Sequence, residues 1–86
     1  MEKNWSISLE HDEYENSLEL VVKDAINAVS ETSQGFYVNV VTPEALGNPE
    51  NYLTPALHMY FGNKINTKFI DQCGCGGYVL RVWKNL

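Results

Sequence analysis

Residues 17–33 carry the pattern that most constrains the fold, because strand patterns flank this helical one on both sides. Its apolar side chains recur on one face at the period of a helix, at Leu18, Val21, Val22, Ala25, Ile26 and Val29. Residues 5–9 alternate apolar and polar side chains, and residues 36–42 are rich in aromatic and β-branched side chains. A strand, a helix and a second strand in this order predict a crossover that brings the two strands parallel.

The second half of the chain predicts another helix and a hairpin. Apolar side chains share one helical face before Gly62, and Pro55 requires that this helix either bend or begin there. Residues 64–70 and Tyr78–Lys84 alternate in the pattern of strands and flank a short loop. This spacing is typical of an antiparallel hairpin.

We therefore predict an α/β (α+β) fold, a two-layer sandwich in the order β-α-β-α-β-β with a mixed four-stranded sheet. The C-terminal hairpin carries the loop, and residues 1–86 form a single domain. Polar side chains in the strands indicate that one face of the sheet is not covered by a helix, namely those of Asn39, Lys68 and Arg81. Apolar side chains interrupt that polar face, namely Tyr37, Val41, Ile70, Val79 and Trp83. A thioredoxin-like arrangement, with helices on both faces, remains the alternative, and the strand order does not follow from the sequence.

Charge and hydropathy exclude several partners. Eleven acidic residues against six basic ones give a net charge of −5, which argues against binding of nucleic acid. No apolar run approaches the length of a membrane span, and the N-terminus lacks the pattern of a secretory signal. We therefore expect a cytoplasmic protein with no membrane partner. In a reducing compartment, two neighbouring cysteines are suited to metal, redox or modification chemistry.

The most unusual stretch occupies the predicted hairpin loop and holds both cysteines and three of the six glycines. It consists of Asp71, Gln72, Cys73, Gly74, Cys75, Gly76 and Gly77. Glycine gives a tight turn its conformational freedom, but a turn alone does not need five residues drawn only from cysteine and glycine. We interpret the stretch as a site of chemistry.

Two kinds of thiol chemistry are alternatives for this loop. A disulfide between Cys73 and Cys75 would be strained and labile, as in redox proteins. However, a strand follows the pair, whereas redox thiolates usually lie at a helix N-terminus. A zinc site needs four ligands, and His11 and His58 are better explained as solvated side chains. We predict no catalytic residue and no metal ligand, and keep a small thiol redox or metal-binding module as the alternative function.

Residues 71–79 resemble a family of small proteins named for its Cys-Gly-Cys-Gly-Gly motif. Its members are regarded as ribosomally made precursors that a radical SAM enzyme modifies. Residues 20–25, 37–42 and 48–53 fit the same family pattern, so the resemblance spans nearly the whole chain. Pro55 departs from that pattern, which bears on the straightness of the second helix.

The resemblance implies that the chain is a substrate and not an enzyme. The partner maturase would use S-adenosylmethionine and iron–sulfur clusters, and this chain itself would bind no cofactor. Cys73 and Cys75 would donate sulfur, and the α-carbons of the neighbouring glycines would accept it in thioether bonds. Residues 1–19 hold six acids against Lys3. The first strand or the acidic loop in this region is therefore a candidate handle for the maturase, with a merely solvated surface as the alternative.

Overall fold

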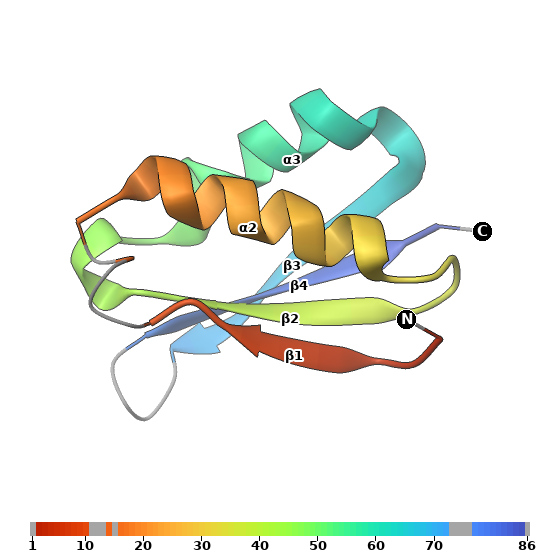
Figure 1. Cartoon of the computed structure of the whole chain (residues 1–86), viewed down its shortest axis with the longest axis horizontal. Helices are drawn as coiled ribbons and strands as arrows, with labels where there is room; N and C mark the ends of the chain where they lie inside the picture. The colour runs from red at the N-terminus through yellow and green to blue at the C-terminus, as the bar shows by residue number, and fades with distance from the viewer. Residues whose placement is uncertain (1, 11–13, 15, 73–76, 86) are drawn as a thin grey trace.

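The computed structural model describes residues 2–10, 14, 16–72 and 77–85, and it confirms the predicted two-layer fold (Figure 1). The strands are β1 (Trp5–Ser8), β2 (Tyr37–Thr42), β3 (Ile65–Gln72) and β4 (Tyr78–Lys84), and the helices are α2 (Leu18–Glu31) and α3 (Leu53–Phe61). Both helices cover the same face of the sheet. Within the described residues no helix covers the other face, so the thioredoxin-like alternative is wrong.

The sheet is mixed, and its strands lie in the order β1-β2-β4-β3. β1 and β2 pair parallel, as the crossover through α2 requires. β4 pairs antiparallel with both of its neighbours, β2 and β3. The predicted C-terminal hairpin is therefore confirmed, and its second strand lies in the interior of the sheet.

Helix α2 begins and ends at side chains that satisfy backbone groups. The Ser17 hydroxyl accepts a hydrogen bond from the backbone N–H of Leu20 at 3.2 Å. At the other end the Thr32 hydroxyl donates to the Ala28 carbonyl at 2.9 Å and accepts from Trp5 Nε1 at 2.8 Å. The helix stops at Glu31, slightly before the predicted end, and Thr32 ties it to β1.

Helix α3 begins close to Pro55 and does not bend there. It starts at Leu53, which places Pro55 in the first turn, where the backbone N–H groups have no partner within the helix. A separate single turn precedes it at Pro49–Asn51, and the Asn48 side chain caps this turn by accepting from Glu50 N at 2.9 Å. Of the two predicted outcomes at Pro55, a helix start is therefore the correct one.

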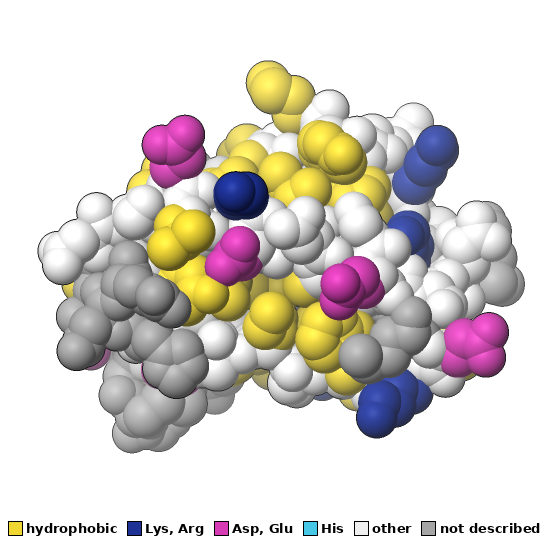
Figure 2. Space-filling model, viewed as in Figure 1, with side chains coloured by type: hydrophobic (Ala, Val, Ile, Leu, Met, Phe, Trp, Pro, Cys, Tyr) yellow, Lys and Arg dark blue, Asp and Glu magenta, His cyan; other side chains and the backbone are white. Residues whose placement is uncertain are grey.

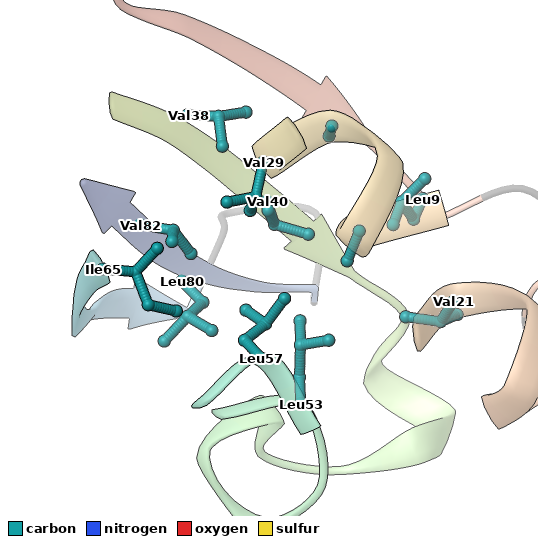
Figure 3. Close-up of a cluster of buried hydrophobic side chains, with 12 residues drawn as sticks. Leu9, Val21, Val29, Val38, Val40, Leu53, Leu57, Ile65, Leu80 and Val82 are labelled. Atoms are coloured by element: carbon teal, nitrogen blue, oxygen red, sulfur yellow. The ribbon is translucent and has the colours of Figure 1, made fainter. Parts of the chain in front are cut away.

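The core lies between the sheet and the two helices (Figure 3). Alternate side chains of β2 and β4 are completely buried, namely Val38, Val40, Leu80 and Val82. Leu53 and Leu57 of α3 point at this surface and are also completely buried. The alternate residues of the strands and the residues on one face of α3 thus pack together in one apolar cluster.

On the face of the sheet that no helix covers, the side chains of the strands pack on one another. The Arg81 guanidinium carbon lies 4.2 Å from the centre of the Tyr37 ring, and Arg81 Nε donates to Asn39 Oδ1 at 2.8 Å. The Tyr37 and Trp83 rings meet edge to face, with centroids 6.0 Å apart. Stacking of a guanidinium on aromatic faces lets these large rings remain half-buried without a second layer of helices.

Candidate functional site

The structure places the cysteine-glycine motif between the two paired strands of the hairpin. Gln72 pairs with Tyr78, and residues 73–77 connect them. Cys73, Gly74, Cys75 and Gly76 lie outside the described residues. Asp71 pairs with Val79 in the backbone register. The strands therefore fix where the motif enters and leaves the sheet.

An irregularity in β3 precedes the motif. Phe69 pairs with Leu80 and Asp71 pairs with Val79, so Ile70 is an extra residue in β3. A bulge of this kind increases the local twist and redirects the strand that follows. The alternation predicted for residues 64–70 is therefore interrupted at its end, just before the motif.

Gly77 is buried against the body of the protein. A side-chain carbon at this position would lie 2.7 Å from the Thr42 carbonyl oxygen and 2.9 Å from Glu10 Cδ, and it would also meet Glu10 Oε2. Contacts this short are not tolerated between unbonded atoms. Close approach of two other segments therefore requires glycine at this position. We call Gly77 with Glu10 and Thr42 the glycine seat.

The two partners of Gly77 come from the ends of the parallel strands β1 and β2. The backbone N–H of Leu9 donates to the Val41 carbonyl at 2.7 Å, which carries the pairing one residue beyond β1 and positions Glu10. The Ser8 hydroxyl donates to Glu10 Oε1 at 3.3 Å. The Thr42 hydroxyl donates to the Tyr78 carbonyl at 3.4 Å, immediately after Gly77. Side chains and backbone from both strands thus hold the C-terminal end of the motif.

A buried tyrosine lies beside the same threonine. The Tyr52 hydroxyl is buried, lies beside the Thr42 side chain and makes no hydrogen bond of normal geometry within the described part of the chain. Burial raises the pKa of Tyr52, and the nearby Thr42 side chain lowers it by a smaller amount. A buried polar group without a well-formed hydrogen bond destabilises the folded state, so we expect this hydroxyl to lower the stability of the chain.

Tyr52→Phe is expected to raise the free energy of unfolding by up to about 1 kcal/mol at neutral pH, because it removes the buried hydroxyl. The raised pKa means that the folded chain favours the neutral hydroxyl. The stability that comes from this difference in pKa is therefore fully present below the unfolded pKa of about 10. It is lost as the pH rises through the pKa of Tyr52 in the folded chain. Urea unfolding at neutral and alkaline pH should show a smaller alkaline loss in the variant. A clear loss of stability at neutral pH would contradict the absence of a partner.

Only one of the two histidines lies in the described part of the chain. His58 is exposed on α3, and its Nδ1 lies 3.3 Å from the Gly62 carbonyl oxygen. His11 lies outside the described residues. Among the side chains that the structure describes, no group of three or more histidine, cysteine, aspartate or glutamate residues could hold a metal ion.

Two concave surfaces lie on other parts of the protein. An apolar groove of about 580 Å³ runs between α2 and α3, lined by Leu18, Val22, Ile26 and Tyr60 together with polar side chains. Figure 2 shows apolar side chains gathered over the helices on this side of the molecule. A second hollow, of about 480 Å³, contains Trp83 and Asn66 at the end of the β3–β4 pair opposite to the motif.

Sequence reasoning identified the motif but not the residues that support it. It counted Glu10 only among the acids of residues 1–19 and gave Thr42 no role in the site. Both contacts depend on how β1, β2 and β4 lie side by side, and no local pattern reports this order. In the described residues no helix is both long enough and apolar enough to cross a membrane.

Comparison with known proteins gives one family. The family described as "Putative radical SAM target protein" matches residues 1–85. No match to the chain was found among curated proteins or among solved structures.

Proposed function

This chain belongs to the radical SAM target protein family, and we propose that its Cys-Gly-Cys-Gly-Gly motif is the part that the partner enzyme modifies. In this proposal the chain is a ribosomally made precursor of the kind its motif resembles. It acts as a substrate and not as an enzyme. The observation that supports the proposal is the position of the motif between two paired strands, at Gln72 and Tyr78, in a chain whose family is described as a putative radical SAM target.

The residue types in the motif suit the formation of a bond between sulfur and an α-carbon. A glycine α-carbon has no side chain, and the adjoining amide nitrogen and carbonyl stabilise a radical centred on it. The glycine would lose one hydrogen atom to the radical that the maturase derives from S-adenosylmethionine. The sulfur of Cys73 or Cys75 would then bond to that carbon, while the thiol proton leaves to solvent and one electron passes to an iron–sulfur cluster of the maturase.

The experiment is coexpression of the chain with its maturase, followed by intact mass measurement and thiol alkylation. Each new carbon–sulfur bond should lower the mass by two hydrogen atoms and remove one alkylatable thiol. Chain expressed without the maturase is the control and should keep both thiols. An unchanged mass together with two reactive thiols after coexpression would reject the proposal.

The edge of β1 is a candidate handle for the maturase. β1 is an outer strand of the sheet and pairs only with β2 among the described strands, so an added strand of the enzyme could extend the sheet there. The acidic stretch that follows β1 is the other candidate, and residues 11–13 of it lie outside the described residues. Binding through these charges would weaken steeply with salt, whereas strand addition would depend on it less.

The alternative function, a thiol redox or metal-binding module, makes different predictions for the unmodified chain. It requires a depressed thiol pKa or stoichiometric binding of a soft metal ion. Thiol titration and metal titration of the chain expressed alone distinguish it from a modification substrate. No contact within the described residues favours it.

A further inference from the structure

We propose that Gly77 is the fixed anchor of the motif and is not itself modified, so that new bonds to an α-carbon form at Gly74 or Gly76. This inference rests on the proposed function, and it narrows the three glycines that the sequence offers as acceptors. Two features of the fold support it: the α-carbon of Gly77 is hard to reach, and the space beside that carbon is already filled.

Access is restricted because Gly77 is buried in the folded chain. Removal of a hydrogen atom requires the radical of the enzyme to reach contact distance from the α-carbon. At Gly77 the Glu10 carboxylate and the Thr42 carbonyl already occupy one side of that carbon. The hydrogen atom on that side is therefore covered by both groups, and burial limits access to the other hydrogen atom.

Space is restricted at the position that an L side chain would take, because a sulfur atom is larger than the carbon that already does not fit there. Glu10 contributes side-chain atoms, which can move away by rotation. The Thr42 oxygen belongs to the backbone of β2, where Thr42 pairs with Tyr78, and 2.7 Å separates it from the side-chain position of Gly77. A bond to sulfur in that position would therefore force β2 and β4 apart at their paired end.

The arrangement also gives Gly77 a role of its own. The residue after it starts β4, and the Thr42 hydroxyl donates to the carbonyl of that residue at 3.4 Å. Glu10 and Thr42 are positioning residues in this view, because they hold the end of the motif and touch no reacting atom. The last residue of the motif is thus a glycine because neighbouring atoms leave no room for a side chain. The earlier positions would be glycine because the bond to sulfur needs an α-carbon without a side chain.

The test is fragment mass spectrometry of chain coexpressed with the maturase, which locates the lost hydrogen atoms residue by residue. We expect them at Gly74 or Gly76 and none at Gly77. A lowered mass with the modification at Gly77 would overturn this inference and leave the proposed function intact. An unchanged mass would reject the proposed function, and the assignment to Gly74 or Gly76 with it.

A second measurement tests the glycine seat without the maturase. Gly77→Ala should lower the midpoint of thermal unfolding more than Gly47→Ala does. Gly47 has a φ of 79° and no atom within 4 Å of its side-chain position, so alanine there introduces backbone strain without crowding. Adding Glu10→Ala to Gly77→Ala should restore only part of the loss, because the Thr42 oxygen remains. A Gly77→Ala midpoint equal to that of the wild type would show that no seat exists and would overturn the inference.

Discussion

Leu57→Ala is expected to lower the free energy of unfolding by about 2–5 kcal/mol, which is a large part of the total stability of a chain this short. Leu57 is completely buried between α3 and the sheet, next to Leu53 and opposite the buried valines of β2 and β4. Truncation removes apolar contacts and leaves a cavity that the paired strands cannot close. Urea unfolding followed by tryptophan fluorescence measures the change.

Met59→Ala is the matched control for this substitution. Met59 lies on the same helix, two residues later, and is 91% exposed. Its truncation should change the free energy of unfolding by no more than about 0.5 kcal/mol, as expected for a surface position. Equal losses in the two variants would contradict the packing of α3 on the sheet.

Replacement of both cysteines is expected to abolish modification completely. The double variant Cys73→Ser, Cys75→Ser should show the same mass with and without the maturase, because no thiol remains to form a bond. Each single variant should keep at most the bonds that its remaining cysteine can make. Intact mass after coexpression measures all three variants.

The control for the cysteine variants is the stability of the chain expressed alone. Serine has nearly the shape of cysteine, so we expect the midpoint of thermal unfolding to stay close to that of the wild type. The loss of modification could then not be attributed to unfolding. Full modification of the double variant would show that the sulfur chemistry proposed for the motif is wrong.

The elements of the fold were predictable because each has its own local pattern. The apolar period of residues 17–33 predicted α2, and the alternation in Tyr78–Lys84 predicted β4. Pro55 was correctly identified as a position where a helix bends or begins, but the sequence could not choose between the two. The choice depends on Leu53, whose burial against the sheet extends α3 by two residues before the proline.

The strand order and the covering of the second face could not be predicted, because both depend on contacts between distant segments. Strand β3 could have followed β2 directly in the sheet, yet β4 lies between them. The apolar side chains on the uncovered face suggested a missing layer. Arg81 supplies the cover by stacking on Tyr37. The same dependence on distant contacts hid the roles of Glu10 and Thr42 beside Gly77.

The interior position of β4 sets a condition on the modification that we propose for the motif. β4 hydrogen-bonds to a strand on each side and contributes Leu80 and Val82 to the core. It therefore cannot separate from the sheet without unfolding of the core. An enzyme that works on the native chain therefore cannot thread this segment through a narrow tunnel as an extended peptide. If the motif is the part that is modified, the active site of such an enzyme must be open enough to receive the end of an intact sheet.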